Sequence, residues 1–435
     1  MWVDIAGAKT NNFLPLNTAF IFLKKCISYL RDVLAQFFRT YKEAYHGITK
    51  PVWILATIQL INRTGSMVLP FMTVYMTSAL GYTKTEAGII MSIFGIGSLA
   101  GSYLGGRWTD KFGPFKVQFL SLTIGGMSYL FIPFLHGFYP LAIGVFICGL
   151  INDSLRPAAS SMTSHFATEA TTTRSFSLMR MAINLGVAIG PAIAGILAGI
   201  NYTWLFIGDG ATCIAAGIVF YYYFKEKQPQ IHTEKKHATT AQTSPYRDGK
   251  FMLFMLFCFF YAAAFFQIFS GIPLYYKDVY FKPEAAIGLL IGFNGLIVFV
   301  FEMITVSQLE KRFRPNAMIV VGCVMLGLSF LIFNIFHGTI ILLIAMLLLS
   351  FSEIFAMPFM ISRVVKSATP QTRGSYLAAY TIAWALAFII SPYSSTQIIE
   401  NFNYTTLWWI MGVFCLLTAF GFHSIAQKQT ATEKL

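Results

Sequence analysis

Two oppositely charged side chains lie three residues apart within an apolar stretch of the chain. They are Asp153 and Arg156, in the segment GLINDSLRPA at 149–158. Residues three apart share one face of a helix, so the two can form an ion pair that needs no ligand. A charge in the middle of a lipid-spanning helix costs about 2.5 to 3.5 kcal/mol, so each one needs a partner or a function. Other polar residues interrupt apolar stretches elsewhere, namely Arg63, Gln267 and Glu353.

The acids in these stretches suit proton transfer. Glu353 is flanked by aromatic and aliphatic residues and has no base within four positions of the chain. Loss of water around such a carboxyl favours its neutral form, which lets it load and release a proton. We therefore expect Glu353 to be the first proton carrier and Asp153 the second. Arg63 and Arg156 are expected to orient Asp153 or to hold an anionic group of a substrate, whereas Asp209 and Glu302 are expected to be structural partners of neighbouring helices.

Long apolar segments must position these residues. Hydrophobic residues make up 56% of the chain and charged residues 11%, whereas a soluble domain has roughly 25% charged residues. About 20 apolar residues cross a hydrocarbon core of about 30 Å as a helix, and lipid offers no partners for the backbone of an open strand. We therefore predict an all-α polytopic membrane protein. Its twelve predicted transmembrane helices are 52–80, 86–106, 115–135, 139–164, 175–200, 203–224, 251–276, 284–307, 317–336, 339–363, 374–398 and 404–425.

The basic residues gather on alternate loops. With the N-terminus placed in the cytoplasm, 26 of the 31 lysines and arginines lie on the cytoplasmic side. The positive-inside rule therefore assigns both termini to the cytoplasm. This asymmetry explains the net charge of +13 by membrane topology, and we predict no nucleic-acid partner. We expect a multi-pass protein of the inner or plasma membrane.

The two halves of the chain resemble each other. TEAGIIMSIFGIG at 85–97 matches PEAAIGLLIGFNG at 283–295, and further matches follow in order at offsets of 198 to 202 residues. Asp153 aligns with Glu353, so we expect these acids to face each other across the space between the halves. Six-helix halves of this kind are typical of secondary transporters, whose substrate site lies between the repeats near the bilayer midplane.

The repeat also predicts how the chain is divided. We expect two pseudo-symmetric six-helix bundles joined by a polar linker, after an amphipathic basic segment that lies at the membrane surface. The predicted divisions are a cytoplasmic N-terminal segment at 1–50, a first bundle at 51–224, a cytoplasmic linker at 225–250, a second bundle at 251–425 and a cytoplasmic tail at 426–435.

The segment GGRWTDKFGPFK at 105–116 resembles the signature loop of the major facilitator superfamily. The matching residues are Gly106, Asp110, Lys111 and Gly113, whereas Pro114 and Phe115 replace the family's common basic pair. The second half supplies a degenerate copy, QLEKRFRP, with Glu310 and Lys311 in the matching places. The resemblance implies the major facilitator fold and a conformational latch on the cytoplasmic face. The alternative is that Asp110 only caps a helix in a basic loop that sets the topology.

The segment NLGVAIGPAIAGILAG at 184–199 is similar to the glycine-rich stripe on helix 5 of drug and proton antiporters in that superfamily. The stripe consists of Gly186, Gly190, Pro191 and Gly195, and Ala194 stands where another glycine is common. This resemblance implies an exporter, although close helix packing explains the same residues. In the superfamily, helices 1, 4, 7 and 10 line a central cavity. That arrangement would bring together Arg63, Asp153, Arg156, Gln267 and Glu353.

The source of energy follows from motifs that the sequence lacks. There is no phosphate-binding loop of the form GxxxxGK[ST], so we predict no nucleotide partner and transport that is driven by a gradient or runs downhill. The seven histidines show no metal-ligand spacing, and we predict no enzyme activity, no cofactor and no metal.

We predict a monomeric secondary active transporter whose partners are a small-molecule substrate, protons and the lipid bilayer. Proton-coupled efflux of drug-like compounds is the first hypothesis. Proton-coupled import of a small nutrient, such as a peptide, a sugar acid or a siderophore-like compound, is the alternative. A membrane receptor or sensor without transport is the third.

Overall fold

The computed structural model describes residues 47–227, 245–369 and 372–432. Within these ranges the regular elements are all helices. Most of the predicted N-terminal segment and most of the predicted linker lie outside the described residues, as do the last residues of the tail.

Twelve helical segments in the described part of the chain are long and apolar enough to cross a membrane, which confirms the predicted number and the all-α fold class. The helices of the first bundle are α2 (Lys50–Thr64), α3 (Val68–Ser78), α4 (Lys84–Phe112), α5 (Pro114–Phe131), α6 (Phe138–Asp153), α7 (Leu155–Phe166), α8 (Thr172–Ile200) and α9 (Thr203–Phe224). Those of the second bundle are α10 (Gly249–Phe265), α11 (Gly271–Asp278), α12 (Glu284–Arg312), α13 (Pro315–Ile335), α14 (Thr339–Ser367), α15 (Arg373–Asn401) and α16 (Tyr404–Thr432).

Three of the twelve spans are broken near their middle. Span 1 consists of α2 and α3, span 4 of α6 and α7, and span 7 of α10 and α11. A proline follows each break, at Pro70, Pro157 and Pro273. Because proline has no N–H, the carbonyl four residues earlier loses its helical hydrogen bond. In span 4 that carbonyl belongs to Asp153, and the Ser102 hydroxyl donates to it at 3.5 Å.

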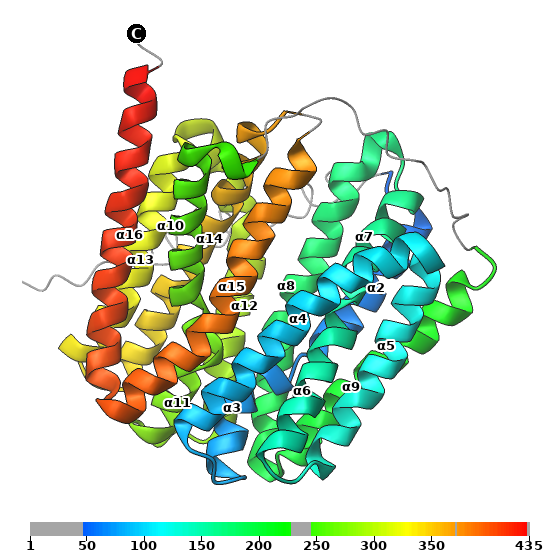
Figure 1. Cartoon of the computed structure of the whole chain (residues 1–435), viewed down its shortest axis with the longest axis horizontal. Coiled ribbons are helices and arrows are strands. Elements are labelled where there is room, and N and C mark those ends of the chain that lie inside the picture. Colours follow the sequence, from blue (N-terminus) through cyan, green and yellow to red (C-terminus); the bar gives the residue numbers. More distant parts are fainter. Residues whose placement is uncertain (1–46, 228–244, 370–371, 433–435) are drawn as a thin grey trace, which may run out of the picture.

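The two bundles stand side by side in Figure 1, with α5, α6 and α9 in one and α13, α14 and α16 in the other. Two long helix pairs join them, α4 with α15 and α8 with α12. The short helices α3 and α11 contact each other at one end of the molecule. The positive-inside rule assigns this end to the exterior, so we call it the outer end and the opposite one the inner end.

Glycines on α4 determine how closely span 4 approaches it. A Cβ at Gly101 would lie 2.8 Å from the Leu150 Cα, and one at Gly105 would lie 2.6 Å from the Ser154 Cα. Small residues let two helix backbones approach in this way. This side of α4 therefore packs inside the first bundle, and it brings span 4 with Asp153 against α4.

Candidate functional site

Asp153 and Arg156 form the ion pair that their spacing predicts. The Arg156 Nε lies 2.6 Å from the Asp153 Oδ1. The hydroxyl of Ser98, on α4, donates to the other carboxylate oxygen of Asp153. Asp153 is buried, whereas 59% of the Arg156 side chain is exposed. The pair thus holds a buried carboxylate at the break of span 4 and presents a guanidinium at its edge.

Arg63 lies in the last turn of α2, just before the break in span 1. Its charge interacts with those of Arg156 and Asp153. Its Nε is buried and has no hydrogen-bond partner among the residues that the structure describes. The Arg63 guanidinium is therefore a second positive group beside the ion pair, as the sequence suggested.

Asp209, on α9, caps the second half of the broken span 1. It is 3% exposed, and its Oδ2 accepts the backbone N–H groups of Met67 and Val68, each at 3.3 Å. The first N–H groups of a helix have no partner within the helix, and a negative charge there also matches the helix dipole. Arg63 stands at the end of α2, where the dipole favours a positive charge. The expectation that Asp209 is a structural partner of a neighbouring helix is confirmed.

Glu353 is half-buried on α14 and faces α12. The Asn294 Nδ2 lies 3.4 Å from its Oε2 and 3.1 Å from the Ser350 hydroxyl oxygen. The two repeats use equivalent helices here, since Asp153 bonds to α4 and Glu353 bonds to α12. The difference between the two acids is that Asp153 is paired with a cation and Glu353 is held by a neutral amide. Sequence reasoning missed Ser98 and Asn294, and the only available signal was a polar residue inside an apolar span.

Gln267 lies in the break of span 7, in the short 3₁₀ turn Phe266–Phe269. It is fully buried, and its Nε2 donates to the Ser391 hydroxyl of α15 at 3.0 Å. Ser391 in turn donates to the Ala263 carbonyl at 2.7 Å. These contacts all lie inside the second bundle, where Gln267 stabilises the broken span against α15.

The helix 5 stripe divides between two neighbours of α8. A Cβ at Gly186 would lie 2.5 Å from the Arg63 Cβ, and one at Gly190 would lie 3.1 Å from the Thr64 carbonyl oxygen. Gly195 instead meets α12, where its Cβ would lie 3.0 Å from the Gly288 Cα. The inner part of the stripe thus packs on broken span 1, and the outer part, from Pro191 onwards, seals the first bundle against the second.

The predicted latch residues lie at the inner end of α4. Gly113 has a φ of +86°, a left-handed conformation that favours glycine, and it connects α4 to α5 in a single residue. Asp110 is exposed, and the Lys111 ammonium lies 5.2 Å from the centre of the Phe112 ring. A Cβ at Gly106 would meet open space. In the second half, the side chains of Glu310 and Lys311 lie outside the described residues, so the latch stays a prediction.

Polar contacts between the bundles close the outer end. Lys84 pairs with Asp278 at 2.8 Å, and the Thr85 backbone N–H donates to Glu400 at 2.6 Å. The Tyr202 hydroxyl donates to Glu284 at 2.6 Å, and Lys277 also bonds to that carboxylate. A hollow of about 450 Å³ lies at this seam. Its lining residues are Thr77, Ser78, Tyr82, Thr83, Lys84, Asp278, Ile399 and Glu400.

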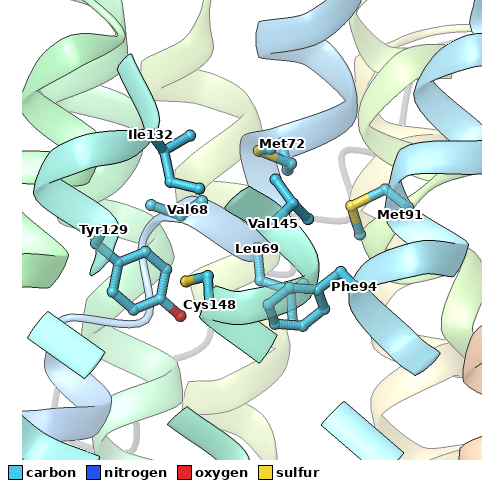
Figure 2. Close-up of a pocket in the computed structure, with 9 residues that line it drawn as sticks. All are labelled: Val68, Leu69, Met72, Met91, Phe94, Tyr129, Ile132, Val145 and Cys148. Carbon is cyan, nitrogen blue, oxygen red and sulfur yellow. The ribbon is translucent and has the colours of Figure 1, made fainter. Parts of the chain in front are cut away.

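A small apolar cavity lies inside the first bundle. Figure 2 shows Tyr129 and Cys148 among the residues around it, with Met72, Met91 and Phe94 on the facing helices. Its volume is about 20 Å³, which is enough for one water molecule. A drug-sized ligand needs several hundred cubic ångströms, so this cavity is not a substrate site.

Comparisons with known proteins agree with the fold. The family model described as Major Facilitator Superfamily matches residues 53–392. A Na(+), Li(+), K(+)/H(+) antiporter of Planococcus maritimus is 24% identical over 392 residues, which cover 83% of this chain and 92% of that protein. The class D tetracycline resistance protein of Salmonella ordonez is 24% identical over 295 residues, or 66% of this chain and 74% of that protein.

A solved structure has the same arrangement of helices. The crystal structure of a nucleoside transporter aligns with 86% of this chain and 98% of its own, with a TM-score of 0.73 and 15% sequence identity. At that identity the likeness concerns the fold alone. Together with the twelve spans, the two bundles and the match over residues 53–392, it shows that this chain is a membrane transporter of the major facilitator superfamily.

Proposed function

We propose that this transporter exports small amphiphilic compounds in exchange for protons, with Glu353 as the coupling carboxyl. The observation that carries the proposal is the contrast between the two repeat-related acids. Asp153 is bonded to Arg156, whereas Glu353 is bonded to the amide of Asn294. A carboxyl with a neutral partner gains and loses a proton more easily than one that is locked in an ion pair.

The charges of span 4 support a polar site between the bundles. A guanidinium does not face lipid tails at this depth, because contact with hydrocarbon costs several kcal/mol. The exposed side of Arg156 therefore faces water, and it offers a positive group near the middle of the membrane. Asp153 and Arg63 stand behind it, so this side of the site suits a substrate that carries a carboxylate, or one with charges of both signs.

The relatives support antiport in two different forms. The tetracycline resistance protein points to drug efflux, which the helix 5 stripe also favours. The Na(+), Li(+), K(+)/H(+) antiporter covers more of the chain and points to alkali cations as a second candidate substrate class. In that case the Glu353 carboxylate, together with the oxygens of Asn294 and Ser350, would offer the hard ligands that such ions prefer. Import of a small nutrient is the alternative function, and it rests on the shared fold.

The decisive experiment is a proton-exchange assay in inside-out vesicles with an acidic lumen. A pH-sensitive dye reports the lumen while tetracycline, ethidium, Na⁺, Li⁺ or K⁺ is added outside. We expect at least one of these compounds to make the lumen more alkaline. Glu353→Gln should abolish that signal, because an amide cannot carry the proton.

Glu226→Gln is the matched control, because Glu226 is an exposed carboxyl at the inner end with 85% of its side chain in solvent. It should retain the full signal. Silence for all five compounds, together with proton entry alongside a nucleoside or a dipeptide in right-side-out vesicles, would replace export by import. A Glu353→Gln variant that exchanges protons normally would remove Glu353 from the coupling path.

A further inference from the structure

A carboxyl also joins the two bundles on the inner half of the membrane. Glu302, on α12, accepts a hydrogen bond from the guanidinium of Arg180 on α8, and the two side chains form an ion pair. Asn184, one turn along α8, donates to the other oxygen of Glu302 at 2.8 Å. Only 13% of the Glu302 side chain is exposed, against 45% of that of Arg180. The sequence suggested a partner on a neighbouring helix, and the partner belongs to the opposite bundle.

This contact between Glu302 and Arg180, which we call the tie, lies close to Glu353. The rings of Phe301 and Phe351 contact each other with centroids 6.1 Å apart, which places this part of α12 beside this part of α14. Glu302 and Arg180 both interact electrostatically with Glu353. By helix rise, Glu353 lies about 21 Å from the outer end of α14 and Glu302 about 27 Å from the outer end of α12. Glu302 is therefore the next acid on the way from Glu353 to the inner end.

The charged surroundings of Glu302 are few in the described part of the chain. The α8 side contributes Arg180 and the amide of Asn184, and the α14 side contributes Glu353. On α11, Lys277 bonds to Glu284 at the opposite end of α12, and Asp278 pairs with Lys84. A change in the charge of Glu302 therefore acts first on Arg180, which loses its counter-ion.

We propose that Glu302 is a second carboxyl of the proton path and that its protonation releases Arg180 and so unties the inner halves of α8 and α12. The proton leaves the O–H of Glu353, directly or through water, and binds a carboxylate oxygen of Glu302. Glu353 becomes the anion and Glu302 the neutral acid, so the charge of the pair is unchanged. The proton then passes from Glu302 to water at the inner end. This role rests on the proposed proton coupling. It adds the step in which protonation lets α8 and α12 separate at the inner end.

The test measures the distance between the inner ends of α8 and α12 in the reconstituted full-length protein, without any substrate. Spin labels are placed at Phe176, 38% exposed near the start of α8, and at Phe313, 49% exposed just after α12. Protons are the only ligand, and the pH is varied from acidic to alkaline. A single proton changes the ratio of two conformations by up to about tenfold per pH unit.

In the unsubstituted labelled protein we expect a long distance at acidic pH and a short one at alkaline pH. Glu302→Gln and Arg180→Gln should give the long distance at every pH, because each removes the tie. Glu353→Gln should keep the pH response, since it leaves the tie intact. Glu302→Asp retains a carboxylate, so its distance should still respond to pH, but less than in the parent protein.

Three results would overturn the proposal. They are a Glu302→Gln protein that still responds to pH, a Glu353→Gln protein that no longer does, and a parent protein whose distance is independent of pH. Because no transported compound is used, the outcome is separate from that of the vesicle assay. A pH response without proton-coupled transport would refute the proposed function and leave the tie established.

Discussion

Replacing Gly195 with alanine tests whether the outer part of the helix 5 stripe holds the closed outer end. The new Cβ would lie 2.4 Å from the Glu284 carbonyl oxygen and 3.0 Å from the Cα atoms of Ala285 and Gly288, all on α12. Carbon atoms prefer separations of about 3.5 to 4.0 Å, so α8 and α12 must move apart by about 0.5 to 1 Å. Extra carbon in a packed contact costs about 1 to 3 kcal/mol. Because the contact joins the bundles in the outer-closed state, this state is destabilised relative to the outer-open one, by about 5- to 150-fold in population.

The assay is the labelling of a buried reporter from outside the cell. Met76, on α3, is fully buried below the outer seam, so Met76→Cys should react with a membrane-impermeant maleimide only when the outer end opens. Gly199→Ala is the matched control, because Gly199 lies one turn further along α8 and its Cβ would meet nothing within 4 Å. The helix propensity that each alanine adds stabilises α8 in the outer-closed and the outer-open state alike, so it does not change the labelling rate. Equal labelling rates in the two variants would show that the contact between α8 and α12 does not hold the outer end closed.

Substitutions at three further positions test other parts of the structure. Asp209→Ala should lower the free energy of unfolding by about 1 to 3 kcal/mol, because it leaves the Val68 N–H at the start of α3 unpaired, whereas the Met67 N–H still donates to the Gly65 carbonyl. Asp209→Asn should cost less, since an asparagine oxygen still caps a helix. Melting curves of the purified proteins compare them. Asp110→Asn should reduce transport while membrane insertion stays normal, and unchanged transport in vesicles would remove the latch role. Lys84→Gln should raise the labelling rate of Met76→Cys, because it breaks the ion pair with Asp278 at the outer end. A labelling rate equal to that of the parent would show that this ion pair does not hold the outer end closed.

The sequence predicts the fold far better than the contacts of the site. Runs of about 20 apolar residues identify the twelve spans, since lipid allows few alternatives to a helix of that length. The breaks in spans 1, 4 and 7 were missed because proline alone does not produce them. Pro70 follows a break, whereas Pro191 and Pro392 lie within the continuous helices α8 and α15. The difference depends on three-dimensional neighbours that can satisfy the freed backbone, such as Asp209 at the start of α3.

The site shows the same limit. The three-residue spacing of Asp153 and Arg156 was sufficient to predict their ion pair, because both lie on one helical face. The partner of Glu302 is Arg180, and these two are 122 positions apart in the chain. Local pattern carries no information about such a pair. The repeat located Glu353 opposite Asp153 in the sequence, but the contrast in their partners required the packing of α12 on α14.

The contact between α3 and α11 has a consequence for the kinetics of transport. Each is a short segment of 11 or 8 residues set off from the rest of its span by a break. Bending at those two breaks moves far less mass than rotating a six-helix bundle, and local hinges commonly act on faster timescales than whole domains. The outer barrier can then open and shut while the bundles keep their relative orientation. A compound bound behind the closed outer barrier would then be enclosed at both ends before the slower rotation of the bundles begins. While it is enclosed, protons would have no continuous path through the protein.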